Sequence, residues 1–405
     1  MQKGLHNRDI IIIGQQPWDT EIGSNCKDIA IELSKNNRVL YVNSPLDRIT
    51  RFRGKADPKI QKRISVIKGE TEGLIEVKEN LWNYYPDCIL ESINWINNHF
   101  AFNFLNKINN RRSAISITKA LKKLKFSDVI LFNDNEMFKG FFLKDFLQPA
   151  ISIYYSRDYM LGVDYWKKHG SGLEPKLIAK SDICFANSQY LADYCSKYNP
   201  NSYNVGQGCD FSNFTDIESV ELSNLPKKDN GEKNIGYVGS LNSERLDIDV
   251  LILIAKSFSN HNILLIGPED ENFKNSELHQ LSNVYFLGAQ PVDTLPQYIL
   301  AIDVCINPQM INEITVGNYP RKIDEYLALG KPTVATSTKT MQLFKDFVYL
   351  ANDAADYVKL INIALAEDSD ALRQDRIQFA MLHTWQNSVK EMSLHVENYE
   401  KLKSN

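Results

Sequence analysis

Short apolar runs that alternate with helical patterns are the feature that most constrains this chain. The runs are rich in Ile, Val, Leu, Phe and Tyr, and they occur at 9–13, 39–42, 129–132, 151–155, 183–186, 235–238, 263–266, 284–287, 304–306 and 333–335. Helical patterns lie between or after them, at 26–35, 113–124, 175–179, 190–197, 248–257, 296–301, 321–329, 354–366 and 370–399. This rhythm is typical of parallel sheets covered by helices on both faces. The sequence therefore predicts an α/β protein.

The length of the chain predicts two domains. A chain of 405 residues exceeds what one ordinary hydrophobic core accommodates. Residues 215–232 are polar and contain Pro226 and Gly231, which is typical of a linker. We expect an N-terminal Rossmann-like domain over 1–214, a linker over 215–232, a C-terminal Rossmann-like domain over 233–383 and a C-terminal helix over 384–405.

The cysteines and the apolar segments indicate the cellular compartment of the protein. The six cysteines form no CxxC pair and no metal-ligand spacing, which favours free thiols in a reducing compartment. The N-terminus passes into the first strand without a long apolar segment, and no later run reaches about 18 apolar residues. We expect a cytoplasmic protein with neither a signal peptide nor a membrane-spanning helix.

Charge is distributed unevenly between the two halves. Residues 1–213 carry a net charge of +6 and residues 214–405 a net charge of −10, which together give the −4 of the whole chain. The positive charge is concentrated in 48–68 and in 94–127, and the second segment also contains Trp95, Phe100 and Phe104. Such a composition favours the surface of an anionic membrane. A solvated helix face over an ordinary core explains it equally well, whereas no nucleic-acid recognition motif accompanies the charge.

Residues 319–336 place charged side chains at the start of a predicted helix between two strands. Pro320 suits the first helical position, and Gly330 suits the end of the helix. The N-terminus of a helix offers free N–H groups and the positive end of a dipole, to which Lys322 adds a full charge. Glu325 lies one turn further on and could accept hydroxyl protons. The arrangement suits an anion that carries a sugar, although a surface helix with an i, i+3 ion pair is the simpler alternative.

Several segments of the second half carry a family resemblance. They are 235–241 (IGYVGSL), 263–268 (ILLIGP), 283–288 (NVYFLG) and 303–308 (DVCINP), followed by 319–336. This series resembles the donor-binding domain of GT-B glycosyltransferases of the family 4 type, which build bacterial surface polysaccharides. The first half is similar through 16–19 (QPWD), 38–42 (RVLYV) and 179–188 (AKSDICFANS). The resemblance implies a GT-B fold, in which two Rossmann-like domains face a central cleft and the C-terminal helix returns to the N-terminal domain.

The resemblance also implies a donor site in the second half. Gly239 and Ser240 end a strand, and Arg245 follows in the next loop, where a guanidinium could hold a diphosphate together with Lys322. Gly288 and Ala289 would bracket the nucleobase. In the first half, Gly23 would let backbone amides approach a phosphate or the acceptor. No GxGxxG occurs there, which argues against a nicotinamide or flavin dinucleotide domain.

One pair of residues departs from the family pattern. Family 4 enzymes carry two glutamates spaced E-x7-E, and Glu325 matches the second, which bonds the ribose of the donor. Gly317 occupies the position of the first glutamate, and the nearest acidic residue upstream is Glu313. Either Glu313 reaches the sugar from a longer loop, or backbone amides and Thr315 replace it. We expect the second arrangement.

Catalytic residues are indicated more weakly. Asp158 follows a predicted strand end and is the candidate for orienting or deprotonating the acceptor, with Arg157 as a further contact. A structural cap is an equally good explanation of Asp158. Asp247 and Asp249 begin a helix and are expected to cap it rather than to bind a metal. We expect no metal and no cofactor, with Arg245 and Lys322 stabilising the leaving diphosphate.

These observations and the resemblance predict a retaining glycosyltransferase that moves a sugar from a nucleotide diphosphate donor to a glycan acceptor. We expect this acceptor to be lipid-linked and to belong to surface polysaccharide synthesis. The expected partners of the enzyme are the donor, the acceptor and an anionic membrane surface on the inner face of the cell membrane, and not nucleic acid. Two alternatives are open: a nucleotide-sugar 2-epimerase of the same fold, and an inactive glycan-binding or nucleotide-binding partner subunit.

Overall fold

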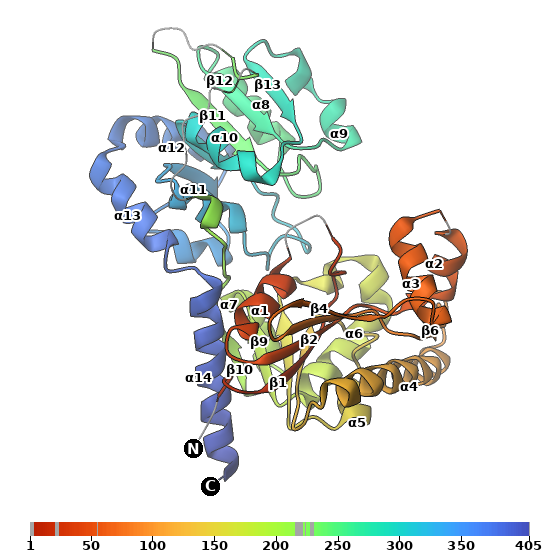
Figure 1. Cartoon of the computed structure of the whole chain (residues 1–405). Coiled ribbons are helices and arrows are strands. Elements are labelled where there is room, and N and C mark those ends of the chain that lie inside the picture. The colour runs from red at the N-terminus through yellow and green to blue at the C-terminus, as the bar shows by residue number, and fades with distance from the viewer. Residues whose placement is uncertain are drawn as a thin grey trace. The chain divides into compact units, whose positions relative to one another are not determined.

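The computed structural model describes residues 4–20, 24–54, 56–214, 222, 224–226 and 231–404. The chain forms two compact units (Figure 1). Unit 1 comprises Met1–Gly206 together with Trp385–Asn405, and unit 2 comprises Gln207–Thr384. The chain therefore passes between the units twice, after Gly206 and after Thr384, and most of the segment predicted as a linker lies outside the described residues.

Unit 1 is built on an eight-stranded sheet in the order β10-β9-β8-β7-β1-β2-β5-β4. Its neighbouring strands pair in parallel, except that β4 runs antiparallel to β5. The strands are β1 (Asp9–Ile13), β2 (Arg38–Val42), β4 (Leu74–Lys78), β5 (Leu81–Tyr84), β7 (Ile130–Asp134), β8 (Ile151–Ser156), β9 (Ile183–Ala186) and β10 (Ser202–Asn204). A separate pair joins β3 (Leu46–Asp47) to β6 (Ile89–Leu90).

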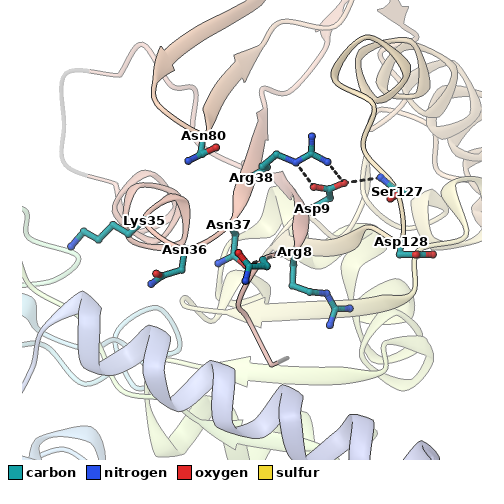
Figure 2. Close-up of a pocket in the computed structure, with 10 residues that line it drawn as sticks. Arg8, Asp9, Lys35, Asn36, Asn37, Arg38, Asn80, Ser127 and Asp128 are labelled. Atoms are coloured by element: carbon teal, nitrogen blue, oxygen red, sulfur yellow. Dashed lines mark hydrogen bonds and ion pairs between the residues drawn. The ribbon is translucent and has the colours of Figure 1, made fainter. Parts of the chain in front are cut away.

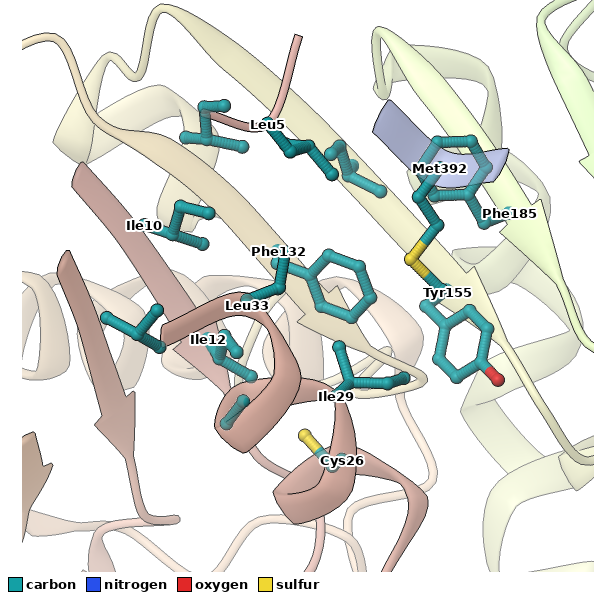
Figure 3. Close-up of a cluster of buried hydrophobic side chains, with 14 of the residues drawn as sticks. Leu5, Ile10, Ile12, Cys26, Ile29, Leu33, Phe132, Tyr155, Phe185 and Met392 are labelled. Carbon is teal, nitrogen blue, oxygen red and sulfur yellow. The ribbon is translucent and has the colours of Figure 1, made fainter. Parts of the chain in front are cut away.

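Helices cover both faces of this sheet. They are α1 (Asn25–Ser34), α2 (Arg48–Arg53), α3 (Pro58–Lys68), α4 (His99–Leu124), α5 (Leu143–Leu147), α6 (Asp164–Lys180), α7 (Gln189–Ser196) and α14 (Trp385–Ser404). Figure 3 shows how Ile29 of α1 and Met392 of α14 meet Phe132 and Tyr155 of the sheet in one buried cluster. The C-terminal helix thus completes the core of unit 1, as the fold prediction stated.

Unit 2 is built on a six-stranded parallel sheet in the order β13-β12-β11-β14-β15-β16. The strands are β11 (Asn234–Val238), β12 (Asn262–Ile266), β13 (Val284–Gly288), β14 (Val304–Asn307), β15 (Thr333–Thr336) and β16 (Tyr349–Ala351). The helices are α8 (Ile248–Ser257), α9 (Glu271–Lys274), α10 (Leu295–Ala301), α11 (Arg321–Ala328), α12 (Ala354–Glu367) and α13 (Asp370–Ala380).

The buried strands explain why these sheets form. Residues of β11 and β12 are buried along their whole length, so both faces of the strands are covered. Parallel strands of this kind need continuous apolar runs rather than alternation, which is the pattern that predicted them. Asp247 accepts a hydrogen bond from Val250 N and so caps α8, which confirms the predicted cap.

The strand order determines where a ligand would bind in each unit. In unit 1 the direction of strand addition reverses between β1 and β7, and in unit 2 it reverses between β11 and β14. Open parallel sheets bind ligands at the carboxyl ends of their strands, at such a switch point. The strand order therefore places candidate ligand sites at the loops that follow β1, β7, β11 and β14.

A polar pocket lies at the opposite, amino edge of the sheet of unit 1 (Figure 2). Arg38 there forms two hydrogen bonds of 2.7 Å with the carboxylate of Asp9, which also accepts from Ser127 N. Arg8 donates to Glu400 at 2.6 Å. These charges are satisfied within the protein, and the pocket is at the wrong edge of the sheet for the site that the strand order indicates.

No helix in the described part of the chain is long and apolar enough to cross a membrane.

Candidate functional site

Two glycines bring the loops after β11 and β12 into contact. Gly239 has φ 143° and Gly267 has φ 149°, a region that favours glycine. Gly239 N donates to Ile266 O at 2.8 Å. A Cβ on Gly267 would lie 1.9 Å from Gly239 O, so a side chain at this position is excluded. The two glycines therefore allow the backbones of these loops to approach closely at the carboxyl end of β11.

Lys322 reaches this strand end from the first turn of α11. Its Nζ lies 3.9 Å from the centre of the Tyr237 ring and is hydrogen-bonded to the Tyr237 hydroxyl. A Cβ added to Gly239 would come within 2.8 Å of the same ammonium. The glycine, the tyrosine and the lysine therefore form one contact cluster at the switch point of unit 2.

Burial lowers the pKa of Lys322 to about 7. The carboxylate of Glu325 opposes this shift, and the positive charge of Arg245 adds to it. Lys322 forms no salt bridge with a carboxylate in the described part of the chain. An anionic ligand beside it would restore its positive charge.

Glu325 lies one turn further along α11. Its side chain is 22% exposed, and Oε1 is 3.5 Å from Arg321 Nε. Burial raises the pKa of Glu325, while Arg321 and Lys322 act in the opposite direction. The sequence-predicted pair Lys322 and Glu325 is thus brought to one site, together with a second cation from Arg321.

Arg245 lies in an exposed loop that is tied to the loop after β14. Met310 N donates to Arg245 O, and Asp247 N donates to Pro308 O, both at 2.9 Å. The guanidinium is close enough for its charge to lower the pKa of Lys322. The two cations predicted to hold a diphosphate therefore belong to the same electrostatic environment. Ser240 is exposed beside them, and its carbonyl accepts from the Tyr237 hydroxyl at 3.2 Å.

The loop between β14 and α11 contains the two residues predicted to contact the sugar. Glu313 is exposed. Thr315 is 2% exposed, and its hydroxyl is hydrogen-bonded to Met310 O and to Asn312 N. Thr315 thus holds the loop together, and this placement does not favour a direct contact with a sugar.

Gly288 and Ala289 lie at the carboxyl end of the edge strand β13. Both are exposed, Gly288 has φ 67°, and a Cβ there would meet nothing within 4 Å. The structure places them on the same edge of the sheet as Gly239, with β12 between the two strands.

Buried contacts fix the position of α11. Tyr326 OH accepts from Val238 N at 2.8 Å and donates to Val238 O at 3.2 Å, which joins the helix to the end of β11. Asp324 is fully buried, 2.6 Å from His383 Nδ1, and it also accepts from Cys209 Sγ. Pro320 lies at the N-cap, one residue before its predicted position. The first turn of the helix is therefore held rigidly against the sheet.

Two side chains of this site were missed from the sequence. Tyr237 contacts Lys322, and Asn307 ends β14 with a buried Nδ2 that has no hydrogen-bond partner among the described residues. Buried polar groups are nearly always satisfied, so Asn307 is a candidate contact for a ligand. The sequence pattern that could have identified Asn307 is a polar residue at the end of a buried strand.

Unit 1 carries the remaining predicted residues. Asp158 follows β8, and its side chain is 40% exposed, 3.0 Å from Arg157 Nη1. Arg157 also donates to Asp134 Oδ1 and to Gln15 Oε1, each at 2.9 Å. Asp134 ends β7, and burial raises its pKa although the charge of Arg157 lowers it. Asp158 is thus held by a buried ion pair at the switch point of this unit, and Gly23 lies outside the described residues.

Two Rossmann-like parallel sheets in one chain, each with candidate ligand residues at its switch point, define the GT-B class of fold. Residues 232–367 match the family model described as Glycosyl transferases group 1, so this stretch is a glycosyl transferase domain. The predicted resemblance to GT-B glycosyltransferases is confirmed by this match and by the fold of solved structures. The sequence predicts a transferase, and the domain match agrees with this enzyme class.

A curated relative is the putative teichuronic acid biosynthesis glycosyltransferase TuaH of Bacillus subtilis, which is 24% identical over 233 residues. The match covers 55% of this chain, and the chain spans 58% of the length of that relative.

Solved structures share the fold across nearly the whole chain at low sequence identity. Sucrose-phosphate synthase from Thermosynechococcus elongatus superposes with a TM-score of 0.67 at 12% identity, covering 98% of this chain and 100% of that one. HepE from Anabaena in complex with UDP superposes with a TM-score of 0.60 at 13% identity, covering 98% of this chain and 100% of that one. Trehalose 6-phosphate synthase from Burkholderia multivorans gives 0.62 at 9% identity and covers 98% of each chain.

Proposed function

We propose that this protein is a retaining glycosyltransferase that uses a nucleotide diphosphate sugar as its donor. The observation that carries the proposal is the cluster of Gly239, Tyr237 and Lys322 at the switch point of unit 2, with Arg245 in its electrostatic environment. A diphosphate beside Lys322 would gain a cation and the positive end of α11. Glu325 would accept the hydroxyl protons of the ribose.

The chemistry requires stabilisation of a leaving diphosphate. Negative charge grows on the phosphate oxygens as the glycosidic bond to the donor breaks, and Lys322 and Arg245 are the groups that would stabilise it. Because the donor phosphate can itself receive the proton of the acceptor hydroxyl, no protein nucleophile is needed. We propose contacts of the nucleobase with Gly288 and Ala289, and of the sugar with Glu313 and Asn307.

We propose that unit 1 binds the acceptor, with Asp158 orienting the attacking hydroxyl. The ion pair of Arg157 with Asp134 would keep the Asp158 carboxylate in place. HepE, to which the fold is similar, was crystallised with UDP and with UDP-glucose, and TuaH is named for teichuronic acid biosynthesis. We therefore propose a UDP-sugar donor and a lipid-linked glycan acceptor of surface polysaccharide synthesis, used at the inner face of the cell membrane.

Calorimetric titration of a panel of nucleotide sugars, followed by turnover assays with and without a glycan acceptor, tests the proposal. We expect one donor to bind, and its nucleoside diphosphate to be released only when the acceptor is present. Interconversion of the sugar without an acceptor would support an epimerase instead. Binding without either reaction would support a partner subunit.

A further inference from the structure

An apolar cavity of about 430 Å³ lies in unit 1 where β6, α4 and α6 meet. Its walls include the side chains of Ile49, Leu90, Ile93, Trp95, Phe102 and Phe138. Ile49 and Trp95 are 44% and 73% exposed, whereas Leu90 and Phe102 are 1% exposed. The cavity therefore has a deep apolar wall and an accessible rim, and its volume lies in the range of small-molecule sites.

Most polar side chains in the wall of the cavity form hydrogen bonds within the protein. Asn109 exchanges two hydrogen bonds with the backbone of Glu91, at 2.8 and 2.9 Å, and Asn106 Nδ2 donates to Phe138 O at 2.9 Å. Asn94 Oδ1 is a buried acceptor without a partner in the described part of the chain, and it offers one place for a hydroxyl or a water. Asp47, Glu91, Lys139 and Lys168 also line the cavity, but most of its exposed lining is apolar and suits an apolar ligand.

The cavity adjoins a second one of about 340 Å³, which has more charged side chains in its lining. Asp47 and Lys139 line both cavities. The second cavity is lined by the loops that follow β1 and β2, which include Asp19 and Ser44, and by residues of α2 and α3. The Asp47 carboxylate caps α2 by accepting from Thr50 N, and Lys139 donates to the hydroxyl of Ser44 and helps to lower the pKa of Asp47 through its charge. An apolar space thus leads to the carboxyl edge of the sheet past a lysine.

Large apolar side chains are exposed in two places, in the lining of the cavity at Trp95 and Tyr165 and on a face of α4 that does not line the cavity. Trp95, Phe100, Phe104 and Tyr165 are each more than half exposed. Phe100 and Phe104 lie on one face of α4, and this face continues with the exposed Lys107 and Arg111. Clustered exposed aromatic residues with cations next to them indicate an interaction surface for an anionic amphiphile.

We propose that the cavity binds the hydrocarbon chain of the acceptor lipid, with the anionic head group of that lipid beside Lys139. This inference rests on the proposed function, because it specifies the acceptor of the same enzyme. The chain of the lipid would pass over Ile49 and Trp95 into the cavity. Its head group would then lie at the carboxyl edge of the sheet, the edge on which Asp158 follows β8.

Fluorescence quenching by a chain-brominated dodecyl phosphate, at concentrations below its micellar range, tests the cavity without donor or turnover. We expect saturable quenching in the full-length protein that is largely lost in Trp95→Phe. Ile49→Glu places a charge at the rim on an exposed residue and should raise the half-saturation concentration at least tenfold. Ile115→Glu changes an exposed residue of α4 that does not line the cavity, and it should behave like the wild type.

Quenching that is unaffected by Ile49→Glu, or that appears only when anionic vesicles are added, would overturn the cavity as the binding site. A second measurement compares acceptors: Ile49→Glu should raise KM for a lipid-linked acceptor and leave KM for its chain-free analogue unchanged. Equal effects on both acceptors would count against the inference. Because quenching needs no catalysis, its failure is distinguishable from failure of the proposed transfer reaction.

Discussion

At the scale of single residues, Lys322 should couple donor binding to a proton. Its pKa of about 7 means that the free ammonium loses its proton as the pH rises above neutrality. A bound diphosphate favours the charged form and raises this pKa, so binding takes up a proton. Affinity for the nucleoside diphosphate should therefore be highest below pH 7 and should fall between pH 7 and 9, by up to about tenfold per unit.

Titration calorimetry in buffers of different ionisation enthalpy measures how many protons are taken up when the nucleoside diphosphate binds. Lys322→Arg supplies a charge that does not titrate in this range, so the variant should lose the proton uptake and the decline above pH 7. Any titration of the ligand itself is common to both proteins and is removed by the comparison. The same pH dependence in wild type and variant would exclude Lys322 as the coupled group.

Glu325 should contribute to donor affinity through hydrogen bonds to the ribose. Glu325→Ala should weaken binding of the nucleoside diphosphate by about 1.5–3 kcal/mol, the range for a lost hydrogen bond to a charged group. Glu271→Ala is the matched control, because that carboxylate is 81% exposed on α9. Titration calorimetry measures both, and an unchanged affinity in Glu325→Ala would remove the ribose role.

At the scale of elements, Tyr326 determines how α11 is held against β11. Tyr326→Phe removes the acceptor of Val238 N and leaves a buried donor unsatisfied. This should lower the free energy of unfolding by about 1–3 kcal/mol. Tyr349→Phe removes a longer hydrogen bond of 3.4 Å to the exposed Glu367 and should cost under about 0.5 kcal/mol. Urea denaturation compares the two, and similar losses would contradict the structural role of Tyr326.

The elements also show what the sequence could predict. Strands such as β1 and β12 are buried on both faces, so their apolar runs identify them directly. β4 is largely exposed and pairs only at the edge of the sheet, so it left no such run and was not predicted. Pro175 suggested the start of a helix, yet it lies inside α6, which begins at Asp164. Here tertiary packing outweighs the local preference of proline.

The candidate site was predictable only in part, for a related reason. Lys322 and Glu325 lie within one helical turn, so a local pattern identifies them together. The contact of Lys322 with Tyr237 joins residues 85 positions apart, and that of Arg157 with Asp134 joins residues 23 apart. Such contacts depend on strand order, which no local pattern contains. Sequence reasoning therefore found the charged residues and missed Tyr237, Asn307 and Asp134, which complete their surroundings.

At the scale of the whole molecule, the uneven charge predicts how the protein meets an anionic bilayer. The half with net charge +6 contains α4, on which Lys107 and Arg111 are exposed beside Phe100 and Phe104. Each basic residue near an anionic surface contributes about 1 kcal/mol, and the attraction is screened by salt. The half with net charge −10 should be repelled, so binding should depend on the exposed face of α4.

Vesicle sedimentation tests this orientation. The double variant Lys107→Glu, Arg111→Glu should lower the partition coefficient onto phosphatidylserine vesicles at least tenfold, since two attractive charges become repulsive. The matched control reverses Lys256 and Lys274, which are about half exposed in the negatively charged half. It should leave vesicle binding unchanged, and raised salt should weaken the wild type toward the level of the α4 variant. If both double variants sedimented like the wild type, α4 would not be the membrane-facing surface, and the donor site of unit 2 would be unaffected by that result.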